Sequence, residues 1–399
     1  MPNFIVLLLV FAAAFSQPGS VKAQESGPLV VNNLGITYEY GSYLTFQSQI
    51  TISNNPNEAY LLFKADGDDT SHIIPIKLDG QGNSFLRYDM SEGKLRPFST
   101  IRFHYLLKFS GGDERTSDEF VFQYEDNRFK WQVLTGDKLT IHWYEGGQAF
   151  GQEALDAAQR GIKKIQELLL VEQTHKIDIY IYSNFDDMDS AMKIGDLSKF
   201  GDHAAPGLRL GLIDITSGPE QVMELGRKIP HELAHILTYD LMGERYFQLP
   251  EWLREGIALQ VELSANPDFS EALTRAAKED ALLPLSELCR EFPPEAGRHF
   301  LAYAESASFT KYIIDKFGQT GILALNGAYG SGLDCRQGMQ EALGKSLDQE
   351  DAQWKASVLG KNSLLVAASN LFPYIAILLV ILAVSLVNVF LIKGKKNGK

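Results

Sequence analysis

Two histidines stand four residues apart in the stretch KIPHELAHILTYD (228–240), and a glutamate directly follows the first of them. On a helix, His231 and His235 project from one face and can both reach a single metal ion. Zinc lowers the pKa of a water that it binds toward 7, and a neighbouring carboxylate can take the proton as the water attacks a carbonyl and return it to the leaving amine. The spacing therefore predicts a zinc site with Glu232 as general base, against the alternative of a helix that carries two ordinary histidines.

A catalytic zinc site needs three protein ligands and one open position. The stretch PEWLREGIA (250–258) restarts a helix and offers Glu255 as the third ligand. The segment between His235 and this helix is long enough to turn back and bring the second helix against the first. The rival third ligands are Glu244 and Glu251.

HELAH followed by EGIA resembles the gluzincin group of zinc metallopeptidases, whose best-known fold is that of thermolysin. More narrowly, the chain is similar to bacterial membrane-anchored proteins described as peptidase MA-like. The resemblance covers roughly residues 30–320. It implies that His231, His235 and Glu255 hold one zinc ion per chain and that Glu232 is the catalytic base. The stretches that carry it are LRPFSTIRFHYLLKF, FVFQYEDNRFKW, IHWYEG, IDIYIYSN, IPHELAHIL, PEWLREGIA and AYAESASFTKYIIDKFG.

The chain departs from the family pattern beside the predicted ligands. Thermolysin-like enzymes often place an acidic residue four positions after the glutamate ligand to orient a histidine ligand, and here that position is Leu259. Asp240 or Glu244 could serve instead. Pro230 would disturb a long uninterrupted helix, so the active helix is expected to begin or kink there.

Peptide hydrolysis also needs a group that stabilises the oxyanion. In the family a downstream Tyr or His often does this, which makes Tyr303 the first candidate and His299 the second; Tyr303 could instead simply pack a helix face. The predicted strand LRLGLIDITSG (208–218) precedes the active helix, as the substrate-side edge strand does in zincins, and could pair with an extended peptide.

The order of predicted elements gives an α+β fold with two domains. Residues 28–126 read as short alternating strands separated by turn residues, which predicts an all-β domain, sandwich-like, of the immunoglobulin or fibronectin type. The resemblance implies that residues 135–360 form a thermolysin-like zincin domain, and the sequence predicts a strand at 138–146. An amphipathic helix at 150–170 follows, and Gly318 is expected to end a helix that begins near residue 301.

Both ends of the chain are hydrophobic. Residues 1–23 resemble a secretory signal peptide, although MPN before the apolar run carries no Lys or Arg. The uncharged run at 371–392 is long enough to form a transmembrane helix, and the Lys-rich tail at 393–399 is expected in the cytoplasm. Export permits a disulfide between Cys289 and Cys335, but two buried thiols fit the sequence equally well.

These features favour a membrane-tethered extracytoplasmic zinc metallopeptidase that acts on a peptide or protein substrate. The net charge of −13 argues against nucleic acid as a partner. The rival hypothesis is a non-catalytic peptide- or protein-binding cell-surface module on a pseudo-peptidase scaffold. The presence of Glu232 argues against that rival, because a binding module has no chemical need for the base.

Overall fold

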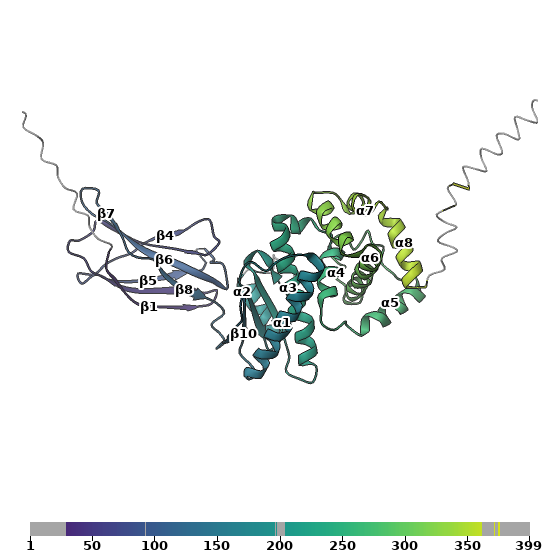
Figure 1. The fold of residues 1–399 in the computed structure, drawn as a ribbon. Helices are drawn as coiled ribbons and strands as arrows, with labels where there is room; N and C mark the ends of the chain where they lie inside the picture. The colour runs from purple at the N-terminus through teal and green to yellow at the C-terminus, as the bar shows by residue number, and fades with distance from the viewer. Residues whose placement is uncertain are drawn as a thin grey trace, which may run out of the picture. The chain divides into compact units, whose positions relative to one another are not determined.

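The structure, a computed structural model, describes residues 29–91, 93–195, 197, 204–360, 371, 374 and 375. The predicted signal peptide and cytoplasmic tail, and nearly all of the predicted transmembrane segment, lie outside these residues. No helix within the described part of the chain is both long enough and apolar enough to span a membrane. The protein is mixed α/β, with its N-terminal sheets followed by a largely helical C-terminal part (Figure 1).

The described chain divides into two compact units. The first consists of residues up to 38 together with 43–92 and 100–122, and the second holds residues 39–42, 93–99 and everything from 123 onward.

The first unit is built from two β-sheets. One sheet has the strand order β1-β2-β5, and the other has the order β4-β3-β6-β7 with β8 also paired to β6. Side chains along β3 and β6 alternate between buried and partly exposed, as expected for strands with one face against a core. The ring of Phe46 lies 5.4 Å from that of Phe63 and 5.3 Å from that of Phe103, so aromatic contacts join the sheets. The strands are β1 (Val31–Glu39), β2 (Tyr43–Ile50), β3 (Glu58–Ala65), β4 (His72–Pro75), β5 (Asn83–Asp89), β6 (Ser99–Lys108), β7 (Glu114–Thr116) and β8 (Phe120–Tyr124).

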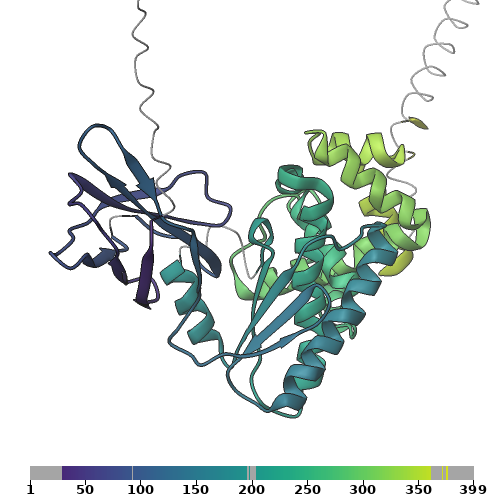
Figure 2. The same cartoon turned by 60° about the vertical axis from the view of Figure 1, so that its left-hand side comes forward.

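The second unit begins with a five-stranded sheet of order β12-β13-β11-β10-β9. Its central strands β10, β11 and β13 are parallel, while β9 and β12 are antiparallel to their neighbours. Helix α1 runs beside this sheet in Figure 2, and α1 and α3 pack on each other and on its strands. The elements up to this helix pair are β9 (Gln132–Thr135), β10 (Leu139–Trp143), α1 (Gln148–Leu169), β11 (Ile177–Tyr182), α2 (Phe185–Gly195), β12 (Ala204–Ala205), β13 (Leu210–Asp214) and α3 (Gln221–Met242).

The apolar periodicity at 150–170 correctly predicted α1 and its buried face. All five periodic apolar residues of this run are buried, namely Leu155, Ala158, Ile162, Ile165 and Leu169. Gly161 lies where α1 crosses α3, and a Cβ there would come within 2.8 Å of the Pro230 ring. The missing side chain therefore lets the two helices approach closely.

Helices complete the second unit. A 3₁₀ segment, η3 (Gly243–Gln248), joins α3 to α4. Helix α6 begins earlier than residue 301 and continues beyond Gly318, which interrupts it with a φ of 67°. The glycine thus ends the predicted helix, but a second helical segment follows at once. The helices are α4 (Glu251–Val261), α5 (Asp268–Glu279), α6 (Ala296–Gly330), α7 (Cys335–Leu343) and α8 (Leu347–Val358).

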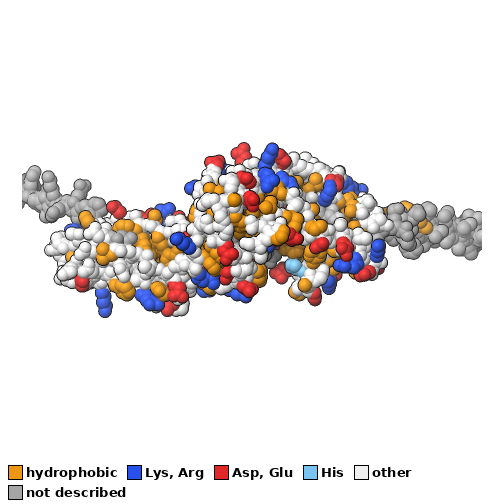
Figure 3. Space-filling model, turned by 90° about the horizontal axis from the view of Figure 1, so that it is seen from below, with side chains coloured by type: hydrophobic (Ala, Val, Ile, Leu, Met, Phe, Trp, Pro, Cys, Tyr) orange, Lys and Arg blue, Asp and Glu red, His pale blue; other side chains and the backbone are white. Residues whose placement is uncertain are grey.

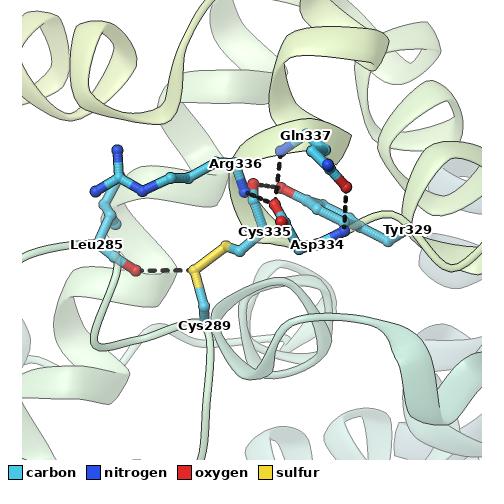
Figure 4. The surroundings of a disulfide bond; sticks show 7 residues. All are labelled: Leu285, Cys289, Tyr329, Asp334, Cys335, Arg336 and Gln337. Atoms are coloured by element: carbon cyan, nitrogen blue, oxygen red, sulfur yellow. Dashed lines mark hydrogen bonds between the residues drawn. A yellow bond between two sulfur atoms is a disulfide. The ribbon is translucent and has the colours of Figure 1, made fainter.

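The two cysteines form a disulfide between the loop before α6 and the first residue of α7 (Figure 4). Their Cα atoms lie 6.0 Å apart. Asp334 caps α7 by accepting hydrogen bonds from the backbone N–H groups of Arg336 and Gln337. The structure therefore decides the question that the sequence left open between a disulfide and two thiols.

Candidate metal centre

The two histidines of HELAH lie on α3 (Gln221–Met242). The sequence predicted that this helix begins or kinks at Pro230; it begins nine residues earlier and contains the proline. A proline inside a helix leaves the carbonyl four residues before it without its usual hydrogen bond. Here that carbonyl belongs to Gly226, and it accepts a hydrogen bond of 2.8 Å from the backbone N–H of Leu263. Pro230 therefore frees a carbonyl that ties α3 to the chain segment directly after α4.

The structure brings His231, His235 and Glu255 together. One nitrogen from each imidazole and one carboxylate oxygen all lie within 4.8 Å of one another. His231 Nε2 is 3.2 Å from Glu255 Oε2, and His235 Nε2 is 3.6 Å from Glu255 Oε1. Two imidazoles and one carboxylate form a donor set suited to catalytic zinc, so these residues fit the predicted ion.

The electrostatics of the cluster favour a positive charge in it. Burial by itself raises the pKa of Glu255, but His235, His231 and Arg254 outweigh burial and bring that pKa down to about 2. Burial lowers the pKa of His231, but hydrogen bonds to Glu255 and Glu262 and the nearby Glu232 charge raise it well above its ordinary value. The carboxylates thus stabilise positive charge at this point, which the imidazoles carry when protonated and which a divalent cation would supply in their place.

Glu262 orients the first histidine by contacting its Nδ1 atom. Its Oε1 lies 3.1 Å from His231 Nδ1, which directs the Nε2 atom toward Glu255. Neither Asp240 nor Glu244 takes this place. Asp240 pairs with Arg209 at 3.2 Å, and Glu244 accepts a hydrogen bond from a tyrosine hydroxyl. The expectation that one of those two orients a ligand is wrong.

Glu262 reaches His231 because α4 ends before it. Its backbone is extended, with φ −51° and ψ 143°, so Glu262 is not part of the helix. It therefore does not share the helix face of Leu259, the residue four positions after Glu255. The Leu263–Gly226 backbone bond then fixes this segment against α3. Helical spacing alone does not identify Glu262 as the partner of His231. The one feature of the sequence that could have indicated it is an acidic residue just past the end of the second helix.

The second histidine also has a partner that the sequence analysis missed. The hydroxyl of Tyr246, in η3, lies 2.9 Å from His235 Nδ1. Burial raises the pKa of Tyr246, so its hydroxyl stays protonated. Each imidazole is thus oriented through Nδ1, which leaves both Nε2 atoms on the side of Glu255.

Gly256, next to the candidate glutamate ligand, lies where α4 meets α6. A Cβ on Gly256 would lie 1.9 Å from Thr310 Oγ1 and 3.0 Å from the carbonyl oxygen of Ser306. The glycine of the EGIA stretch therefore allows α6 to pack directly against α4 and thereby fixes the position of Glu255.

The two rival third ligands have other roles in the structure. Glu251 forms an ion pair with Arg254 on the same helix. Glu244 is exposed and bonded to Tyr239. Within the described residues, the candidate metal group contains neither of them.

Tyr303 lines a cleft together with His231 and Glu232. Its ring packs against Phe292 and His299 at centroid distances of 5.1 and 5.2 Å. His299 is turned toward the carbonyl of Pro293, 3.1 Å from Nδ1, and is not among the residues that line the cleft. Of the two oxyanion candidates, the structure therefore places Tyr303 beside the site.

The predicted edge strand is shorter than expected and is not at the edge throughout. β13 covers residues 210–214, and its first two residues pair with Ala204–Ala205 of β12. Gly211 on this strand faces α3, because a Cβ there would lie 3.4 Å from Cβ of Glu232.

Comparison with known protein families decides the family. A sequence model of the Peptidase MA superfamily matches residues 157–360, just over half of the chain. The chain belongs to the peptidase MA superfamily. The match contains α3, α4 and the whole His-His-Glu cluster. Peptidases of this superfamily are typically zinc-dependent, and the superfamily also includes inactive members.

The other comparisons give no information about the function of this member of the peptidase MA superfamily. A search of curated proteins finds no match. Among solved structures, TarS from S. aureus is similar over 29% of this chain and 21% of its own, with 4% identity and a TM-score of 0.17. Purple acid phosphatase PPD1 from yellow lupin is similar over 46% and 34%, with 11% identity and a TM-score of 0.19. Chitinase ChiW from Paenibacillus is similar over 64% and 24%, with 10% identity and a TM-score of 0.22. The chain spans less than two thirds of each of these proteins.

Proposed function

We propose that this protein is a zinc-dependent peptidase that hydrolyses peptide bonds outside the cytoplasm. Its membership of the peptidase MA superfamily makes it a peptidase-like protein, for which peptides are the implied substrates. The observation that carries the proposal is the convergence of His231, His235 and Glu255 on one point. Glu232, the residue between the histidines that could act as a base, lines the adjoining cleft.

In this proposal His231, His235 and Glu255 hold one zinc ion, and Glu262 and Tyr246 keep the two imidazoles in position. When bound, zinc supplies a Lewis acid that polarises the substrate carbonyl and lowers the pKa of a water. Glu232 takes the proton from the attacking water and returns it to the leaving amine. Tyr303 donates a hydrogen bond from its hydroxyl to the carbonyl oxygen as negative charge develops on it.

The sequence also supports a place for the enzyme. Export by the segment at 1–23 and anchoring by the segment at 371–392 would hold the peptidase at the outer face of a membrane. The N-terminal unit would be a sandwich of the immunoglobulin or fibronectin type that spaces the site or recruits substrate. The Lys-rich tail at 393–399 supports this orientation.

The test measures zinc and cleavage together on the full-length protein in mild detergent. We expect about one zinc per chain in the wild type and in Glu232→Gln, and none in His235→Ala. Only the wild type should cleave a library of quenched peptides. His175→Ala is a matched control, because this exposed histidine lies outside the cluster and its loss should change neither result.

Two results would contradict the proposal. Absence of zinc from the wild type after reconstitution would mean that the cluster is not a zinc site. Zinc binding with equal, residual cleavage by the wild type and Glu232→Gln would instead favour a pseudo-peptidase that binds peptides without cutting them.

A further inference from the structure

A cavity of about 260 Å³ opens next to the candidate metal centre. Helix α3 contributes His231 and Glu232 to its lining, so any group bound in it lies beside the reacting atoms of the proposed peptidase. The rest of the lining comes from β13, two further residues of α3, the end of α4 and the segment after it, the start of α5 and the start of α6. The cavity is thus continuous with the site and is formed by elements far apart in the sequence.

One part of the lining is apolar. Leu259 from α4, Phe269 from α5 and Phe300 from α6 all contribute to it. The rings of Phe269 and Phe300 meet edge to face, with centroids 5.2 Å apart. All three side chains are only partly buried, so they offer accessible apolar surface to a ligand.

Four of the charged side chains in the lining form two ion pairs. Lys228 Nζ lies 3.0 Å from Asp214 Oδ1, and Arg227 Nε lies 3.8 Å from Glu262 Oε2. A charged ligand group would have to disrupt such a pair or lose its own hydration without a new partner. An uncharged apolar group meets neither cost. On the face seen in Figure 3, positive and negative side chains are likewise interspersed, with hydrophobic ones between them.

We propose that this cavity is a specificity pocket for an aromatic or large aliphatic side chain of the substrate residue that flanks the scissile bond. Phe269 and Phe300 determine that preference. This inference rests on the proposed peptidase function, since it assigns the occupant from the position of the cavity beside Glu232. Burial of a Phe or Leu side chain, compared with Ala, predicts about ten- to hundredfold tighter binding.

The test measures binding separately from cleavage. Full-length Glu232→Gln protein is loaded with zinc and titrated by calorimetry with capped pentapeptide amides, in which the central residue is Ala, Leu, Phe, Asp or Lys and the others are Ala. We expect the Phe and Leu peptides to bind about ten- to hundredfold more tightly than the other three. Adding Phe269→Ala or Phe300→Ala should reduce this preference to a fewfold, and Leu259→Phe, which fills the cavity, should make the Ala peptide bind better than the Phe peptide.

Phe185→Ala is the matched control, because this phenylalanine is exposed on α2 and lies outside the cavity lining. Thermal unfolding of each variant identifies any that fail to fold, and Leu259→Phe, which removes no core contact, keeps the test informative in that case. Equal affinities across the peptide series, no binding of any peptide, or an unchanged preference in the folded Phe269, Phe300 and Leu259 variants would overturn the inference. A clear apolar preference without cleavage by the wild type would instead refute the peptidase function and leave the pocket assigned.

Discussion

Replacement of Gly256 by alanine tests whether the packing of α4 on α6 positions the candidate metal centre. The new Cβ would lie 1.9 Å from Thr310 Oγ1, 2.9 Å from Thr310 Cβ and 3.0 Å from the carbonyl oxygen of Ser306. Rotation of the threonine side chain can relieve only the first contact. The other two involve atoms fixed by the α6 backbone, so the helices must separate.

The expected loss of stability follows from two opposing terms. Alanine in place of glycine stabilises a helix by roughly 0.5–1 kcal/mol. Overpacking of a close contact typically costs about 1–3 kcal/mol, and three short contacts put Gly256→Ala at the upper end of that range. We therefore expect a net loss of about 2 kcal/mol, which corresponds to a fall in Tm of roughly 4–8 °C.

The assay compares thermal unfolding and zinc affinity for the wild type and three variants. Gly297→Ala is the matched control, since no atom lies within 4 Å of a Cβ at that position on α6, and it should be neutral or slightly stabilising. Gly256→Ala should also bind zinc more weakly, because it displaces the neighbouring Glu255. Thr310→Ala added to Gly256→Ala should restore part of the stability. A Gly256→Ala protein that unfolds at or above the wild-type temperature with unchanged zinc affinity would refute this account of the helix contact.

Three further predictions concern other parts of the second unit. Glu262→Gln should weaken zinc binding about 10–100-fold, whereas the control Glu224→Gln, earlier on α3, should not. Equal zinc affinities of the two variants in a competition titration would contradict this prediction. Burial raises the pKa of Glu305 to about 8, so the folded state holds this proton more tightly than the unfolded chain and stability should fall as pH rises from about 4.5 to 8. Glu305→Gln should flatten that decline in urea unfolding at pH 5 and pH 8, and parallel profiles would refute the assignment. Loss of the disulfide in the Cys289→Ser, Cys335→Ser protein should lower the free energy of unfolding by roughly 2–4 kcal/mol, and no difference from oxidised wild type would show that the crosslink does not stabilise the fold.

The local patterns were sufficient for the main elements of the site. The HELAH and EGIA stretches each lie within one helix, and residues three or four apart on a helix share a face whatever the rest of the fold does. The α1 helix was predictable for the same reason, because its apolar spacing marks the side that must be buried. Alternating runs before residue 126 likewise indicated strands.

The surroundings of the two histidines were not predictable from spacing. Glu262 was missed because α4 ends just before it and a backbone bond from Leu263 to α3 brings its carboxylate to His231. Tyr246 was missed because η3 folds it back onto His235, although the two residues are eleven apart in the chain. Both contacts depend on where a helix stops, which tertiary hydrogen bonds decide.

The sequence by itself determined the residue types that can bind a metal, the helices that carry them and the presence of a carboxylate between the two histidines. These are properties of short segments, because helical periodicity fixes which side chains lie on one face. Only the tertiary structure decided that Glu255 rather than Glu244 or Glu251 joins the histidines, and that Cys289 and Cys335 form a disulfide. It also decided that apolar side chains from three helices line a cavity beside them. Those outcomes require elements far apart in the chain to meet, and close packing permits that meeting only at positions such as Gly161 and Gly256, where a side chain is missing.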